Sequence, residues 1–85
     1  MSIYRLFGSE IEISRAEEAR VRDRYLKHYV QLNEALKDTN EDDCLKALIL
    51  EITGKDRVNM KYRLHYKFSE LRAQRERKQH NIRKV

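Results

Sequence analysis

The chain has 85 residues, of which 39% are charged and 40% apolar, and its formal net charge at pH 7 is +5. A chain of this length forms one domain at most and buries only about 60–65% of its unfolded surface, which leaves little room for an internal active-site cleft. No apolar run approaches the roughly 20 residues of a membrane-spanning helix, and the first residues lack the pattern of a signal peptide. We therefore expect a single cytoplasmic domain that does not bind membranes.

The positive charge is concentrated at the C-terminal end. Residues 55–85 contain eleven basic and three acidic residues, a balance of +8, whereas residues 41–54 contain one basic and four acidic residues, a balance of −3. Such asymmetry indicates a polyanionic partner, with nucleic acid as the first expectation and an acidic protein surface as the second.

Residues 1–13 predict either a short β-hairpin or an irregular extended arm. Apolar and polar residues alternate from Glu10 to Ile13, and Gly8-Ser9 is a dipeptide suited to a two-residue hairpin turn. An isolated two-stranded ribbon is only marginally stable in water. The sequence leaves both alternatives open.

One long helix is predicted from Arg15 to Lys37, beginning at a capping box formed by Ser14 and Glu17. At about 100° per residue, its apolar residues fall on one face, and charged residues occupy the opposite face. We expect the apolar stripe to face the core, and its members are Val21, Leu32, Tyr25, Leu36 and Tyr29, widened by Leu26, Val30 and Ala19.

A short second helix follows a polar turn. Thr39 or Asn40 is placed to cap it, and the acidic residues 41–43 complement the helix dipole in its first turn. Residues 44–52 are apolar nearly all round, which predicts the most buried helix of the three. Its cysteine, Cys44, should therefore be a buried structural thiol.

A third helix is predicted from near Arg57 to at least Arg77. Gly54 should end the preceding helix in a left-handed conformation, and Asp56 should cap the new one. Its core stripe is expected to consist of Met60, Leu64, Phe68 and Leu71. A second, weaker apolar set on another face consists of Val58, Tyr62, Tyr66 and Ala73.

These elements predict a mainly α fold: a small three-helix domain with two long, roughly antiparallel helices, a short helix buried between them, and an N-terminal arm or hairpin. Residues 14–71 form the expected helical core. Beyond Leu71 the side chains offer little to anchor the chain, so residues 72–85 should form an overhanging basic helix or a frayed tail.

Nothing in the sequence is typical of an enzyme. Cys44 has no catalytic partner, and the neighbouring Asp42 and Asp43 would raise its pKa. We expect no catalytic residue, no metal ligand and no cofactor. The histidines share no spacing typical of metal ligands, and they are His28, His65 and His80.

The function expected from charge placement is non-enzymatic binding of nucleic acid, DNA or RNA, or of a nucleoprotein complex. A helix-turn-helix over residues 49–63 is a weak match, because acidic residues open its first helix. The candidate contacts are on the third helix and the tail: Arg63, Lys67, Arg72, Gln74, Arg75, Arg77, Lys78, Arg83 and Lys84.

Two other classes of function stay open. One is an adaptor or inhibitor, of the kind that phages and mobile elements encode, that docks on an acidic surface of a host protein. The other is a structural subunit of an assembly. Either class, or a homodimer, would use a partner surface formed by Val58, Tyr62 and Tyr66.

Overall fold

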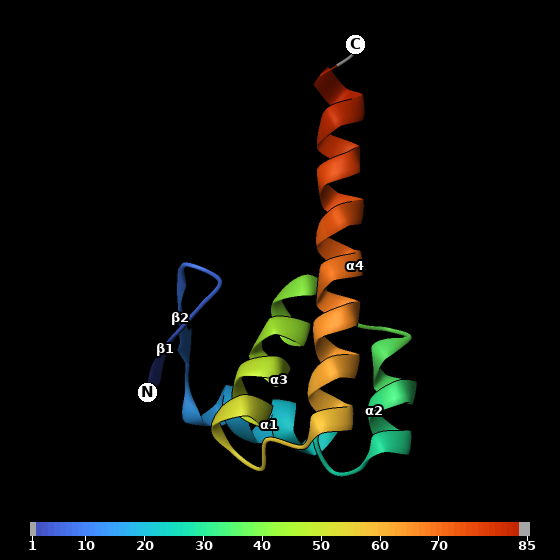
Figure 1. The fold of residues 1–85 in the computed structure, drawn as a ribbon. Coiled ribbons are helices and arrows are strands. Elements are labelled where there is room, and N and C mark those ends of the chain that lie inside the picture. Colours follow the sequence, from blue (N-terminus) through green and yellow to red (C-terminus); the bar gives the residue numbers. More distant parts are fainter. Residues whose placement is uncertain (1, 84–85) are drawn as a thin grey trace.

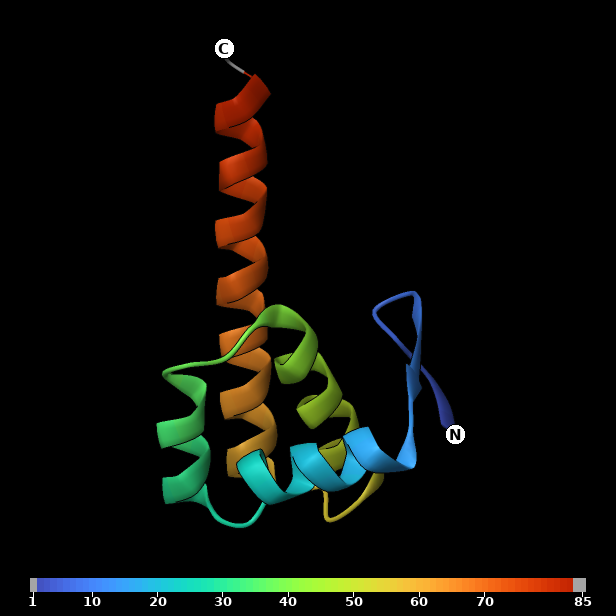
Figure 2. The same ribbon diagram turned by 180° about the vertical axis from the view of Figure 1, so that it is seen from behind.

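The computed structural model describes residues 2–83, without the side chains of residues 9 and 78–83. It confirms a mainly helical fold with an antiparallel two-stranded hairpin at the N-terminus (Figures 1 and 2). α3 packs along α4, α1 lies across the base of the molecule, and the hairpin and α2 lie on opposite sides of α4 (Figure 1). The elements are β1 (Ser2–Leu6), β2 (Ser9–Ile13), α1 (Arg15–Tyr25), α2 (Tyr29–Leu36), α3 (Glu41–Thr53) and α4 (Val58–Arg83).

The N-terminal residues form the hairpin rather than an irregular arm, but the turn lies one residue earlier than predicted. Leu6 pairs with Ser9, so the two turn residues are Phe7 and Gly8, with φ of 52° and 77°. Two positive φ angles give the turn a twist that matches the flanking strands. The ring of Phe7 stacks on Phe68 of α4, with centroids 5.5 Å apart and planes 4° from parallel, which holds the hairpin tip against the helix.

The prediction of a single helix over residues 15–37 is wrong, because the chain breaks between α1 and α2. His28 has an extended backbone, and its Nδ1 accepts a hydrogen bond from the Gln31 N–H at 3.1 Å, which caps a new helix. The Gln31 side chain donates to the Asp23 carbonyl at 2.6 Å. Arg57 donates to the Leu26 carbonyl at 2.7 Å. Capping side chains and a distant arginine thus satisfy the backbone groups that a continuous helix would have paired internally.

The break changes which residues face the core. Five of the eight residues in the predicted stripe are buried, but Tyr29, Val30 and Ala19 are exposed, the first two at 39% and 69%. α1 lies across the base and α2 lies alongside α4 (Figure 2). The core-facing residues of the two helices therefore cannot be predicted by treating residues 15–37 as one straight helix. The buried residues are Val21, Tyr25, Leu26, Leu32 and Leu36.

α3 is the most buried helix, as predicted. The Asn40 side chain caps it by accepting a hydrogen bond from the Asp43 N–H at 2.8 Å. The side chains from Ala47 to Glu51 are all buried, together with Cys44. The apolar character of this segment on nearly every side is explained by its position against α4, α1 and the hairpin.

The thiol of Cys44 is fully buried and donates a hydrogen bond to the Leu64 carbonyl at 3.4 Å. Burial raises its pKa to about 12, so burial rather than the neighbouring aspartates is the cause. We expect a thiol reagent to modify Cys44 far more slowly in the native protein than in denaturant. In the native protein the thiol is inaccessible to the reagent, and its raised pKa keeps it protonated rather than in the reactive thiolate form. Equal labelling rates would show that α3 is not the central helix.

The connection between α3 and α4 differs from the predicted caps. Gly54 has a φ of −107°, which is not left-handed, and glycine is needed because a Cβ would lie 2.8 Å from the Leu50 carbonyl oxygen. Asp56 takes the left-handed conformation instead, with φ of 51°, and its carboxylate pairs with Lys61. The Glu51 carboxylate accepts a hydrogen bond from the N–H of Arg57, the residue before α4.

α4 is a single helix of 26 residues, of which only the first half packs on the domain. Met60, Leu64 and Phe68 are buried and Leu71 is partly buried, as predicted. Residues 72–83 continue as regular helix for about 18 Å beyond the core, at 1.5 Å per residue. Figures 1 and 2 show this segment rising past the other elements. We call residues 72–83 the overhang.

Candidate nucleic-acid interface

The overhang presents exposed guanidinium groups on a helix that the core does not cover. Arg72, Arg75 and Arg77 are all exposed. Arg72 pairs with Glu76 one turn later, at 3.3 Å, and Arg75 pairs with Glu41 of α3 at 3.5 Å. Because exposed ion pairs contribute only about 0–1 kcal/mol, both arginines can exchange a carboxylate for a phosphate at little cost.

The other candidate contacts of this segment are placed in part. Gln74 is exposed on the overhang. The backbone of Lys78 and Arg83 continues α4, while their side chains are not described, and Lys84 lies outside the described residues.

Arg63 and Lys67 lie in a different environment from the overhang. The Arg63 Nε donates a hydrogen bond to the Asn33 side chain of α2 at 2.9 Å. The side chains of Arg63 and Lys67 are only partly exposed. Lys67 retains 20% of its side-chain exposure and pairs with Glu70 at 3.5 Å. Both cations therefore already have protein partners, Arg63 on α2 and Lys67 on α4 itself.

The predicted partner surface is exposed. Val58, Tyr62 and Tyr66 retain 60%, 68% and 67% of their accessible surface. They lie on the side of α4 that faces away from Met60 and Leu64, since these two groups are about half a turn apart at 100° per residue. Tyrosine is enriched at protein interfaces relative to the rest of the surface.

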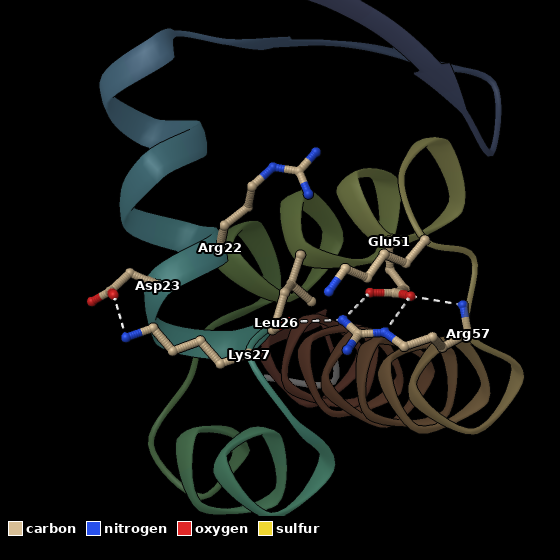
Figure 3. A pocket seen from close by; sticks show the side chains of 7 residues that line it. Arg22, Asp23, Leu26, Lys27, Glu51 and Arg57 are labelled. Atoms are coloured by element: carbon tan, nitrogen blue, oxygen red, sulfur yellow. Dashed lines mark hydrogen bonds and ion pairs between the residues drawn. The ribbon is translucent and has the colours of Figure 1, made fainter.

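A second group of cations lines a pocket that the sequence did not indicate. The pocket has a volume of about 480 Å³ and lies between the end of α1 and the connection from α3 to α4 (Figure 3). No contiguous motif marks it, because its residues come from three separate parts of the chain. They are Arg22, Asp23, Leu26, Lys27, Glu51, Lys55 and Arg57.

The cations of this pocket are largely neutralised within the protein. Glu51, which is 1% exposed, accepts three hydrogen bonds from Arg57: from the backbone N–H at 2.7 Å, from Nε at 3.1 Å and from Nη2 at 2.8 Å (Figure 3). Arg22 pairs with Glu18, and Lys27 pairs with Asp23. The pocket is therefore a weaker anion site than the overhang, despite its shape.

The electrostatics of the Glu51–Arg57 pair follow from this geometry. Burial alone would raise the pKa of the Glu51 carboxyl, but the hydrogen bonds from Arg57 outweigh burial and hold that pKa below its ordinary value. The same carboxylate raises the pKa of Arg57. The pair is ionised at neutral pH and ties the N-terminus of α4 to α3.

This pair also weighs against a helix-turn-helix. A recognition helix presents its N-terminal residues to base edges. At that end of α4, Arg57 is already paired with the Glu51 carboxylate. The three carboxylates in the first turn of α3 lie farther along α4, because Glu41 pairs with Arg75 of the overhang.

The described residues contain no cluster of three His, Cys, Asp or Glu side chains that could hold a metal ion. His28 caps α2, and His65 packs against Phe7 with ring centroids 5.6 Å apart. The side chain of His80 is not described. Within residues 2–83, no helix combines the length and the apolar character needed to cross a membrane.

Comparisons with protein-family models, with curated proteins and with solved structures find no match to this chain.

Proposed function

We propose that this protein binds nucleic acid, without catalysing a reaction, through the overhang of α4. The observation that supports this proposal most is the projection of an uninterrupted basic helix about 18 Å beyond the core. Within residues 72–77 it carries three arginines and one glutamate. A helix with no apolar face in this stretch has no folding reason to extend so far.

The shape of the overhang fits a polyanion. An α-helix is about 10–12 Å across with its side chains, and the major groove of B-DNA is about 12 Å wide. Guanidinium groups at residues 72, 75 and 77 point to several sides of the helix, so the helix can reach phosphates on both walls of a groove. Neutralising these charges would also relieve their mutual repulsion and stabilise the last turns of α4.

Arg63 and Lys67 have a smaller role in this proposal. Both already have protein partners, so binding a phosphate would cost the interaction with Asn33 or Glu70. We expect the arginines of the overhang to provide most of the phosphate contacts.

The proposal predicts a strong salt dependence. Each phosphate contact contributes a slope of roughly −0.7 to −0.9 to a plot of log affinity against log salt concentration. Replacing Arg72, Arg75 and Arg77 together by Gln should flatten that slope by about 2–3. Titration of a labelled duplex and a labelled single strand at several salt concentrations measures it.

The matched control removes three exposed cations from other elements, namely Arg5, Lys27 and Lys37, each also replaced by Gln. All three pair with local carboxylates, and none of them lies on α4. The control has the same net charge as the triple Arg variant, so equal slopes for the two variants would show that total charge rather than the overhang matters. No binding at about 0.1 M salt would contradict the proposal outright.

An adaptor that docks on an acidic protein surface is the second candidate. The exposure of Tyr62 and Tyr66, at 68% and 67%, favours it. A pull-down from lysate with and without nuclease separates the two functions. Partners bridged by nucleic acid are lost after nuclease treatment, whereas a protein held by the tyrosines is retained and is lost instead in the Tyr62→Ala variant.

A further inference from the structure

An exposed face of α4 repeats with the period of the helix over four turns. Val58, Tyr62, Tyr66, Ser69 and Ala73 follow one another at intervals of four, four, three and four residues and fall within an arc of about 80°. All five are exposed. In Figure 1, α4 lies in front of α1 and α3, and no other element crosses it. We call these five residues the tyrosine face.

The side chains of the tyrosine face change in size along the helix. The large residues Tyr62 and Tyr66 lie in its first half, and the small residues Ser69 and Ala73 lie in its second half. Such a surface protrudes at one end and is recessed at the other, so it fits the same surface of a second copy whose helix runs in the opposite direction. A two-fold axis brings such a surface together with a second copy of itself.

We propose that two copies of this chain pair through the tyrosine face, with their α4 helices antiparallel. With the two-fold axis between residues 67 and 68, Tyr62 of each copy packs over the partner's Ala73. Tyr66 packs over the partner's Ser69. Small residues at these positions let the helix backbones approach closely, and each tyrosine ring is buried on contact.

The charges along one edge of the tyrosine face are complementary in this arrangement. A two-fold axis between antiparallel helices brings each edge against the same edge of the partner. On one edge, Glu70 and Arg63 come within two residues of register with each other across the axis. On the other edge, Lys61 comes within two residues of register with both Glu76 and Arg72, so this edge is mixed. Opposite charges therefore meet on the first edge, twice by symmetry.

A parallel pair lacks these advantages. Every residue would then meet its own copy, so Tyr62 would meet Tyr62 and Arg77 would meet Arg77. The two overhangs, which share an excess of positive charge, would lie side by side and repel each other. The antiparallel pair directs the overhangs in opposite directions. This inference does not depend on nucleic-acid binding, and nuclease-treated protein tests it.

The first test measures the mass of the protein in solution as a function of concentration. The expected result is a rise from the monomer mass of 10.3 kDa to twice that value. Ala73→Tyr should abolish the rise, because a second tyrosine cannot fit under Tyr62. Ala19→Tyr, a matched change at an exposed position of α1, should leave the rise unchanged. A monomer at every attainable concentration would overturn the proposal, as would a dimer that tolerates Ala73→Tyr.

The second test determines helix direction by cross-linking. Asn59 and Arg77 come within one residue of register across the axis, and neither is a member of the tyrosine face. A mixture of Asn59→Cys and Arg77→Cys proteins should form a cross-linked pair, while each variant alone should not, because residue 59 lies about 25 Å along the axis from its own copy. The native Cys44 is buried and does not interfere. Cross-linking of each variant with itself would mean a parallel pair and would overturn the antiparallel arrangement.

Discussion

Replacing Glu51 by Ala is expected to destabilise the protein by about 3 kcal/mol, at the lower end of the range for removing one partner of a buried ion pair. The carboxylate is 1% exposed and accepts three hydrogen bonds from Arg57. Its loss leaves the Arg57 guanidinium and the Arg57 backbone N–H without this carboxylate. Because Arg57 keeps 27% of its side-chain exposure, water offsets part of the cost. Urea unfolding at neutral pH measures the change.

The matched control is Glu34→Ala. Glu34 also forms a carboxylate pair, with Lys37, but the two side chains are 68% and 72% exposed. Such a pair contributes about 0–1 kcal/mol, so this variant should unfold nearly as the native protein does. Equal losses in the two variants would mean that Glu51 does not hold α3 to α4.

The contribution of Glu51 should depend on pH in one direction. Its pKa in the folded protein lies below the ordinary value of 4.5, because hydrogen bonds from Arg57 outweigh burial. A depressed carboxyl pKa adds stability that is complete above the ordinary pKa and is lost as pH falls through the folded value. The difference in unfolding free energy between the native protein and Glu51→Gln should therefore shrink in acid. A difference that grows in acid would contradict the ionised pair.

The starts of helices that are marked by capping residues could be predicted from the sequence. Ser14 and Glu17 form the expected capping box, and Asn40, one of the two expected caps, opens α3. These signals operate within a few residues of the chain. The break after Tyr25 had no comparable signal, because histidine is an unusual capping residue and the partner of the Leu26 carbonyl, Arg57, lies 31 residues away.

The hairpin turn shows a similar limit. Gly8-Ser9 fits a turn on local grounds, yet the register places Phe7 at a positive φ that a bulky residue rarely adopts. The compensation is tertiary, since the Phe7 ring stacks on Phe68 of α4. A contact across 61 positions of sequence leaves no trace in a local pattern.

The candidate site was also predictable only in part. The charge balance indicated the basic end of the chain, and the exposure of Val58, Tyr62 and Tyr66 agrees with a surface separate from the core. Spacing on α4 alone could not show that Arg63 contacts Asn33 of α2. Nor could it show the pocket around Glu51, whose residues converge only after α1, α3 and α4 pack together.

Truncating the core face of α4 should cost several times more stability than truncating its outer face. Leu64 is fully buried and Phe68 is 6% exposed, so Leu64→Ala and Phe68→Ala are each expected to lose about 2–5 kcal/mol by leaving a cavity. Tyr62 is 68% exposed, and Tyr62→Ala should change stability by only about 0.5 kcal/mol.

The comparison must be made at low protein concentration, because a dimer held by Tyr62 would otherwise add its own binding energy to the unfolding free energy. Denaturant melts of the three variants under these conditions measure the difference directly. Equal losses would mean that α4 is buried on both sides within one chain. The outer face would then have no surface left for a partner, since the same tyrosine ring cannot both pack inside the domain and contact a second molecule.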